Sequence, residues 1–182
     1  TINVSSPNTK NLRDLQKPEL LEKILQRVNA INHSLKRQVP IFIKIAPDLN
    51  ENNVTEILNV CEENHVSGLI ATNTTINPKT LKKQTTFEGG LSGRPLFKPS
   101  NKILRLLAER KSRSTVLIGV GGVFSASDIY EKIKMGASAV QIYTGFVYKG
   151  PMHIKNMEME LRNLLLNDGY SSIDKAVGTL IR

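Results

Sequence analysis

The chain alternates between short apolar runs and longer amphipathic segments, and this alternation restricts its fold more than any other feature. Apolar runs rich in β-branched residues predict strands at 39–47, 68–75, 115–120 and 139–144. Apolar residues at helical spacing predict helices at 18–32, 51–64, 100–111, 125–136 and 152–167. Strands that alternate with helices of this length predict an α/β protein with a parallel sheet.

The chain opens on what we interpret as the end of a further strand, because Ile2 and Val4 alternate with polar residues until Pro7. Five strands are therefore expected. Polar or glycine residues lie at or near the carboxyl ends of all five, at Ser6, Lys44, Asn73, Gly122 and Tyr143. Ligand sites of parallel α/β proteins lie at this end of the strands.

This pattern is typical of a (β/α)₈ barrel, and an open doubly wound sheet is the alternative. A complete barrel takes about 250 residues, and five strands cannot close one. We therefore expect residues 1–182 to be the C-terminal part of a single barrel domain. Its first three strands would lie on a missing or separate segment.

Composition excludes several classes of function. The net charge of +9 favours anionic ligands, an acidic membrane surface or nucleic acid. Nucleic acid is disfavoured, because no basic stripe interleaved with aromatic residues occurs. The single cysteine, Cys61, argues against disulfides and cysteine-rich metal sites. It shares an apolar helical face with Val54 and Ile57, so we expect it in the core, and no metal site is predicted.

The glycine-rich segment 119–122 follows a predicted strand and would expose backbone N–H groups beside a helix N-terminus. Such a segment suits a phosphate, although a tight strand-to-helix turn needs the same glycines. Barrels often bind phosphate with the loops after strands seven and eight. On our count Gly121 follows the seventh strand, and Tyr143 and Thr144 follow the eighth.

Lys44 interrupts an apolar strand, so it either meets an anionic or electron-rich partner or lies on the polar rim of the barrel. Ser6 is the candidate reactive hydroxyl. No histidine is placed to complete a hydrolase triad, and no Gly-x-Ser-x-Gly elbow occurs. Ser6 would therefore act as a proton acceptor in a specialised site.

Six segments together resemble the class 2, quinone-dependent dihydroorotate dehydrogenases: Asn-Val-Ser-Ser-Pro-Asn-Thr, Lys-Ile-Ala-Pro-Asp-Leu, Ala-Thr-Asn-Thr-Thr, Gly-Gly-Leu-Ser-Gly-Arg-Pro-Leu, Ile-Gly-Val-Gly-Gly-Val and Val-Gln-Ile-Tyr-Thr-Gly. They cover the whole chain in family order. The resemblance implies an FMN-dependent barrel enzyme of de novo pyrimidine biosynthesis. Such an enzyme oxidises dihydroorotate to orotate, with hydride passing from C6 to flavin N5, and gives the electrons to a membrane quinone.

The resemblance also implies roles for individual residues. Ser6 matches the base that takes the C5 proton, where class 1 enzymes have cysteine, and Thr9 matches an assistant in proton relay. The implied substrate contacts are Asn3, Asn8, Asn73 and Thr74. The implied FMN contacts are Asn3, Lys44, Thr72, Gly93, Gly122, Tyr143 and Thr144.

The resemblance further implies peripheral membrane association through a segment outside this chain. The bacterial cytoplasmic membrane is the expected location, with the mitochondrial inner membrane as the alternative. Two other functions stay open. One is another FMN barrel oxidoreductase, either a class 1 enzyme or a dihydropyrimidine dehydrogenase. The other is an inactive fragment with a binding or assembly role.

Overall fold

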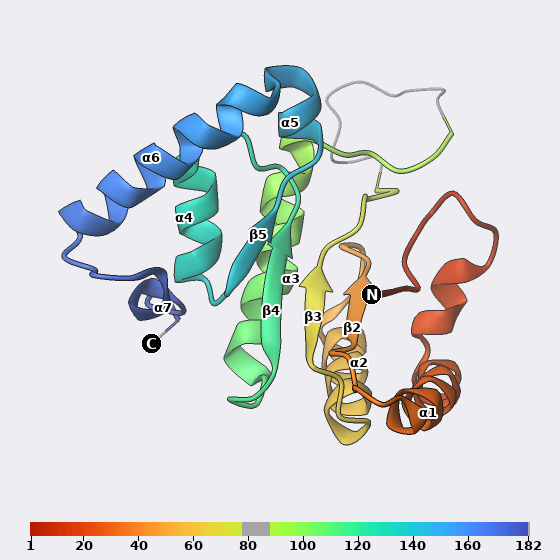
Figure 1. Ribbon diagram of the computed structural model, residues 1–182. Helices are drawn as coiled ribbons and strands as arrows, with labels where there is room; N and C mark the ends of the chain where they lie inside the picture. The colour runs from red at the N-terminus through yellow and green to blue at the C-terminus, as the bar shows by residue number, and fades with distance from the viewer. Residues whose placement is uncertain (78–87, 182) are drawn as a thin grey trace.

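The computed structural model describes residues 1–77 and 88–181, and a parallel sheet of five strands lies at its centre (Figure 1). The strands are β1 (Ile2–Asn3), β2 (Phe42–Ile45), β3 (Gly68–Ala71), β4 (Val116–Val120) and β5 (Ala139–Gln141). They are hydrogen-bonded in chain order, β1-β2-β3-β4-β5. Each predicted strand is present, although the ordered strands are shorter than the apolar runs.

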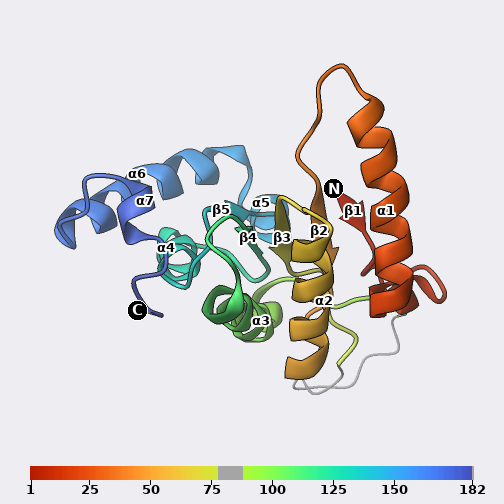
Figure 2. The same cartoon turned by 90° about the horizontal axis from the view of Figure 1, so that it is seen from below.

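The strand order identifies the fold as part of a (β/α)₈ barrel. A doubly wound sheet reverses its strand order at the point where it binds ligands, and this sheet has no reversal. Figure 2 shows α1, α2, α3 and α4 in an arc around one side of the strands. Helices on one face of a curved parallel sheet are the arrangement of a barrel wall. The alternative of an open doubly wound sheet is therefore wrong.

The helices fill the connections between the strands, and most of them were predicted. The longer ones are α1 (Pro18–Ser34), α2 (Glu51–Glu63), α3 (Phe97–Arg110), α4 (Ala126–Lys134) and α6 (Pro151–Asn167). The shorter ones are η1 (Leu12–Gln16), η3 (Arg94–Leu96), α5 (Thr144–Lys149) and α7 (Ile173–Ala176). The shorter helices were not predicted, because fewer than two turns give an apolar pattern no room to repeat.

Alternation along β2 separates the two faces of the sheet. Ile43 and Ile45 are fully buried beneath the helices, whereas Phe42 and Lys44 are half-buried on the opposite face. The main core lies between the sheet and helices α1, α2 and α3. It includes Leu21, Leu25, Ile43, Ile57, Leu58, Leu69, Leu104, Leu107 and Leu117. Cys61 lies within it, as predicted, and burial raises the pKa of its thiol to about 12.

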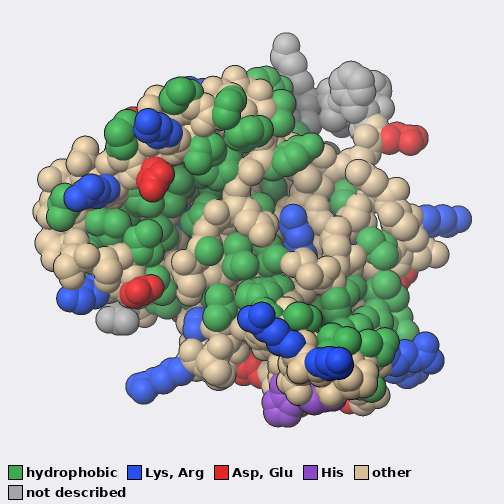
Figure 3. Space-filling model, in the orientation of Figure 1, with side chains coloured by type: hydrophobic (Ala, Val, Ile, Leu, Met, Phe, Trp, Pro, Cys, Tyr) green, Lys and Arg blue, Asp and Glu red, His purple; other side chains and the backbone are tan. Residues whose placement is uncertain are grey.

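A smaller core joins α4 to α6 and α7 through Tyr130, Ile133, Leu165 and Ala176. The region around α5 and the start of α6 nevertheless keeps large apolar side chains at the surface. Green side chains gather over these helices in Figure 3, and the exposed ones include Tyr143, Phe146, Val147, Tyr148 and Met152. In the part of the chain that the structure describes, no helix has the length and apolar character needed to cross a membrane.

Candidate active site

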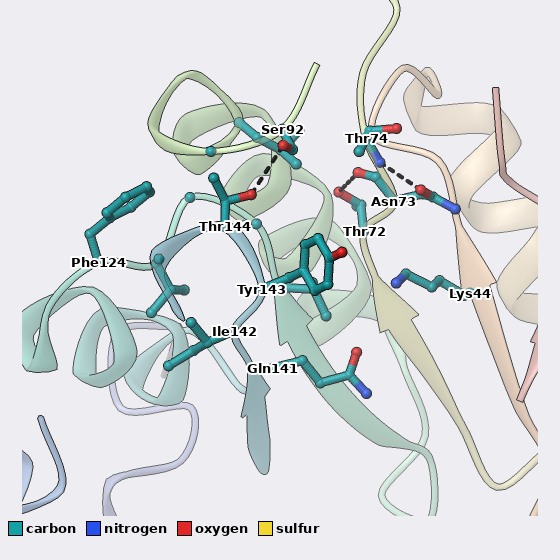
Figure 4. Close-up of a pocket in the computed structure, with 17 residues that line it drawn as sticks. Lys44, Thr72, Asn73, Thr74, Ser92, Phe124, Gln141, Ile142, Tyr143 and Thr144 are labelled. Carbon is teal, nitrogen blue, oxygen red and sulfur yellow. Dashed lines mark hydrogen bonds between the residues drawn. The ribbon is translucent and has the colours of Figure 1, made fainter. Parts of the chain in front are cut away.

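A cavity of about 200 Å³ opens at the carboxyl ends of the strands, on the face of the sheet that carries Lys44. Figure 4 shows it between the ends of β2 and β3 on one side and those of β4 and β5 on the other. Of the predicted site residues, it is lined by Lys44, Thr72, Asn73, Thr74, Gly93, Gly122, Tyr143 and Thr144. These residues belong to segments far apart in the chain, so the fold alone brings them together.

Lys44 extends from β2 into this cavity (Figure 4). Its side chain is partly removed from water, and this desolvation lowers the pKa of the ammonium group. Among the described residues, no acceptor forms a hydrogen bond or an ion pair with it. A half-buried ammonium without a partner is available to an anionic or electron-rich ligand. Lys44 therefore lies where a contact with such a ligand would require it, and the contact itself remains a prediction.

Three polar side chains at the ends of β1 and β3 form a connected cluster. The Asn73 amide donates hydrogen bonds to Asn3 Oδ1 at 3.0 Å and to Ser5 Oγ at 3.1 Å. The Ser5 hydroxyl donates to the Lys44 carbonyl at 2.6 Å. Asn73 also orients its own loop, because its Oδ1 accepts from the Thr74 backbone N–H at 2.8 Å. Two predicted substrate residues, Asn3 and Asn73, are therefore in direct contact.

Sequence reasoning did not single out Ser5, although Ser5 is fully buried within this cluster. The only signal was its position beside Ser6 at the end of the predicted strand. Strand alternation does not explain its burial, because β1 ends at Asn3 and the neighbouring Val4 is buried as well.

The predicted catalytic residues Ser6 and Thr9 and the predicted substrate residue Asn8 occupy the loop after β1 and do not line the cavity. Ser6 is half-buried, and its Oγ accepts from the Asn8 backbone N–H at 3.3 Å. Asn8 and Thr9 are exposed. The structure thus places Ser6, Asn8 and Thr9 together on one loop, apart from the residues that line the cavity. The catalytic roles of Ser6 and Thr9 and the substrate contact of Asn8 remain predictions.

The loop that begins at Gly89 lies close to the loop after β1. A Cβ on Gly90 would overlap Thr74 Oγ1 and lie 2.6 Å from Pro7 Cγ. A Cβ on Gly89 would lie 3.1 Å from Asn8 Oδ1, and the backbone there has a positive φ of 111°. Any side chain at Gly90 would therefore displace Thr74 or Pro7. This close approach explains the paired glycines.

The far side of the cavity is built from glycine-rich backbone and hydroxyl groups. Gly93 and Gly122 have positive φ angles of 80° and 72°, and a Cβ on Gly122 would lie 2.5 Å from Phe97. The Thr144 hydroxyl donates to Ser92 Oγ at 3.0 Å, which joins the loop before η3 to the start of α5. Three loops thus converge without an acidic side chain in the lining. This chemistry suits a phosphate-bearing ligand.

Beneath this wall lies a buried lysine that the sequence reasoning missed. Lys132 of α4 is fully buried, and its Nζ donates to Asn101 Oδ1 at 2.6 Å and to Ser100 Oγ at 2.9 Å. Ser100 Oγ in turn lies 3.3 Å from the Gly121 carbonyl oxygen. Burial lowers the pKa of Lys132 to about 8, and the nearby carboxylates of Glu131 and Asp128 oppose this shift.

One sequence signal for Lys132 existed. It lies three residues after Ile129 and next to Ile133, which is the spacing of the apolar face of a helix. A lysine is expected to reach water with its amine, so this spacing was not interpreted as burial.

Comparisons with known proteins identify the family of this chain. The family model described as "Dihydroorotate dehydrogenase" matches residues 1–165. A dihydroorotate dehydrogenase (quinone) from Christiangramia forsetii is 46% identical over 161 residues, covering 88% of this chain and 47% of that protein. One from Myxococcus xanthus is 43% identical over 177 residues, covering 97% of this chain and 49% of that protein.

A crystal structure of DHODH from Eimeria tenella in complex with ferulenol superimposes with a TM-score of 0.92 at 34% sequence identity. The match covers 100% of this chain and 53% of that one. The chain therefore spans about half the length of the relatives that it matches.

Fold and cavity together define the five-stranded part of a (β/α)₈ barrel with a ligand site at the carboxyl ends of its strands. The chain belongs to the dihydroorotate dehydrogenase family, whose members are flavin-dependent oxidoreductases.

Proposed function

We propose that this chain supplies the FMN site and much of the substrate site of a quinone-linked dihydroorotate dehydrogenase. The enzyme would oxidise (S)-dihydroorotate to orotate in de novo pyrimidine biosynthesis. The observation that carries the proposal is the Lys44 ammonium, which extends into a cavity whose other described lining residues are uncharged. They supply amides, hydroxyls and glycine backbone, together with apolar side chains such as Leu96, Val123 and Ile142. A single cation among neutral donors suits a ring system that gains negative charge on reduction.

The lining fits FMN in its chemistry. Gly93, Gly122, Tyr143 and Thr144 would hold the phosphate and ribityl chain, because positive-φ glycines allow close backbone approach and Thr144 adds a hydroxyl. Lys44 and Thr72 would contact the flavin ring. When bound, FMN supplies an acceptor for the hydride that leaves C6 of the substrate.

The loop after β1 would supply the proton acceptor. We assign Ser6 Oγ to take the proton from C5, with Thr9 assisting its transfer away. The amides of Asn3, Asn8 and Asn73, together with the Thr74 hydroxyl, would hold the ring and carboxylate of the substrate. Amides donate and accept hydrogen bonds without adding charge, so they can orient an anionic substrate beside Lys44.

The remaining barrel strands are part of the proposal. Both β1 and β5 are edge strands, and exposed parallel edges are rare in stable proteins. Apolar side chains at Phe146, Val147 and Met152 are exposed on α5 and at the start of α6, the helices that follow β5. We infer that a polypeptide with the first barrel strands covers these surfaces. A further segment would bring the enzyme to the membrane that holds the quinone, bacterial or mitochondrial.

An absorbance spectrum of the purified complete enzyme tests the proposal. We expect flavin absorption at about one FMN per barrel, because there is one cavity of this kind for each copy of the fold. Anaerobic dihydroorotate should bleach it, and a quinone should restore it. A flavin that stays oxidised with dihydroorotate would contradict the proposed reaction. A purified enzyme without flavin that also binds no added FMN would contradict the proposed cofactor.

A further inference from the structure

Arg13, a residue with no expected role, joins three segments that follow three neighbouring strands. Its Nε donates to the Ser5 carbonyl at 3.1 Å, after β1. Its Nη1 binds Asp48 Oδ2 at 2.8 Å, after β2. Its Nη2 donates to the Thr74 carbonyl at 2.7 Å, after β3. One guanidinium group therefore holds the ends of β1, β2 and β3 together.

Asp48 extends the same network further along the β3 loop. Its Oδ1 accepts from the Thr75 hydroxyl and its Oδ2 from the Ile76 backbone N–H, the latter at 3.1 Å. The Arg13 and Asp48 side chains are each 20% exposed, so the pair lies mostly between the loops. Partial burial and several hydrogen bonds make such a pair more rigid than an exposed one.

Neither Arg13 nor Asp48 lines the cavity, so a ligand there would not touch them. They act on the groups that flank it. The Ser5 carbonyl immediately precedes Ser6, and the Thr74 carbonyl follows the Asn73 side chain that lies in the cavity wall. A shift of either carbonyl would move Ser6 relative to Asn73 and Thr74.

We propose that Arg13 is a positioning residue for catalysis: it sets the loop that carries Ser6 against the strand end that carries Asn73 and Thr74. This inference rests on the proposed function of the site. It predicts that Arg13 affects substrate binding and proton removal, but not FMN binding, because the glycine-rich wall receives no contact from it.

The helix η1, which carries Arg13, is also attached to the end of β2 through Gln16, so the effect of losing the Arg13 guanidinium group can be separated from a loss of η1 packing. Gln16 Oε1 accepts from the buried Ala46 backbone N–H at 2.9 Å, and Gln16 Nε2 donates to the Arg13 backbone carbonyl at 3.3 Å, so neither bond involves the Arg13 guanidinium group. Removal of the guanidinium group should therefore leave η1 docked on β2 while the Ser5 and Thr74 carbonyls lose a shared donor. Lysine cannot replace it, because one ammonium on a flexible stem does not reproduce a planar fork directed at separate acceptors.

The test uses Arg13→Met and Arg13→Lys in the complete flavin-loaded enzyme, with Arg110→Met as the matched control. Arg110 also binds a carbonyl, a hydroxyl and a carboxylate, from Glu51 and Thr55, but it does not line the cavity. Three quantities are measured: the Kd of FMN, the Kd of orotate, and the rate of flavin reduction at saturating dihydroorotate.

For both Arg13 variants we expect the reduction rate to fall roughly 10- to 100-fold, the scale of a small misplacement of reacting groups. Orotate affinity should fall about 10-fold, because Asn73 and Thr74 lose their fixed position. The Kd of FMN should stay within about threefold, and Arg110→Met should behave like wild type in all three. Wild-type orotate affinity and reduction rate in Arg13→Met would overturn the proposal.

A double-mutant cycle separates positioning from a general loss of stability. If Arg13 acts through Ser6, Arg13→Met should slow the Ser6→Ala enzyme by no more than about threefold, whereas independent effects would multiply. Multiplying effects would overturn the proposal. Flavin reduction of the wild-type enzyme by dihydroorotate, measured in the same series, tests the proposed function independently of Arg13. If the wild-type enzyme fails to reduce its flavin with dihydroorotate, the function is wrong. A working wild type with an unaffected Arg13 variant overturns only the role of Arg13.

Discussion

The Ser5 hydroxyl donates a hydrogen bond to the Lys44 carbonyl at 2.6 Å, which ties the loop after β1 to the strand that carries the cavity lysine. Ser5 also receives a hydrogen bond from Asn73 at 3.1 Å. The buried Ser5 hydroxyl thus links Lys44, the proposed flavin contact, to Asn73, the proposed substrate amide. Ser6, the proposed proton acceptor, is the next residue in the chain. Ser5 is fixed within this network, whereas Ser6 lies outside the network and accepts only from the Asn8 backbone N–H among the described residues.

Ser6→Ala should slow flavin reduction by about 10²-fold or more, the usual effect of removing a positioned general base. FMN and orotate should bind nearly as before, because alanine preserves packing and leaves the amide cluster in place. Ser6→Cys should keep part of the activity, since a thiolate can also take a proton. Stopped-flow reduction of the complete enzyme by dihydroorotate measures these rates.

Ser5→Ala is the matched control for the Ser6 variant. It removes a hydroxyl one residue away that donates to the Lys44 carbonyl, so it should weaken orotate binding as well as slow reduction. If Ser6→Ala reduces its flavin within a few-fold of wild type, Ser6 is structural and the base lies elsewhere.

Lys44→Ala should weaken FMN binding or slow flavin reduction, because it removes the cation that extends from β2 into the cavity. Flavin content after purification and the rate of reduction are the two measurements. Lys44→Arg is the control that keeps the charge and alters the geometry, and it should be impaired less. Unchanged flavin content and unchanged kinetics in Lys44→Ala would return Lys44 to the interpretation as a rim residue.

Gly122→Ala should reduce FMN retention strongly, because a Cβ there would lie 2.5 Å from Phe97 and the φ of 72° disfavours any L side chain. The loop would have to move away from the position that forms the cavity wall. Gly169→Ala is the control, since its φ is 79° but no atom lies within 4 Å of its Cβ position. It should lose about 1–2 kcal/mol of stability through backbone strain while it keeps FMN. Equal flavin content in the two variants would contradict a role for the Gly122 turn.

Lys132 should make the stability of the protein depend on pH in the alkaline range. Its pKa is about 8 in the folded state and 10.5 as the ordinary value, so the unfolded chain binds more protons between these limits. Stability therefore rises with pH through this window, and below about pH 8 the full desolvation cost is present. The gain across the whole window is at most about 3 kcal/mol, and partial relaxation would make it smaller.

The measurement compares wild type with Lys132→Met in urea unfolding between pH 7 and pH 10. The free energy of unfolding of wild type should increase relative to that of the variant as the pH rises, because methionine does not titrate. Lys134→Met provides a control from the same helix, since Lys134 is partly exposed beside Asp168. A difference between wild type and Lys132→Met that stays constant with pH would show that Lys132 does not titrate as its burial requires.

Much of the architecture could be predicted from the sequence. Strand and helix patterns are local, so the run around Ile43 and Ile45 predicted β2, and the repeated leucines of 18–32 predicted α1. The predicted helix at 125–136 begins at Ser125, and this residue caps α4, because Ser125 Oγ accepts from the Asp128 N–H at 3.2 Å. The Asp128 carboxylate does not complete a capping box, because it binds the Phe124 N–H and Arg94 instead.

By itself, the sequence determined the α/β alternation and the strand ends where polar residues gather, since both depend on local periodicity and residue type. It favoured a barrel, but the strand order of the tertiary structure was needed to exclude an open doubly wound sheet. Only the tertiary structure decided which polar groups meet. Arg13 reaches Asp48 and Thr74 across 35 and 61 positions of the chain, and Lys132 reaches Ser100 across 32. Such contacts depend on strand register and the paths of loops, which no local pattern encodes. For this reason part of the cavity lining was predicted from the sequence through the family resemblance, and the residues that hold it in place were not.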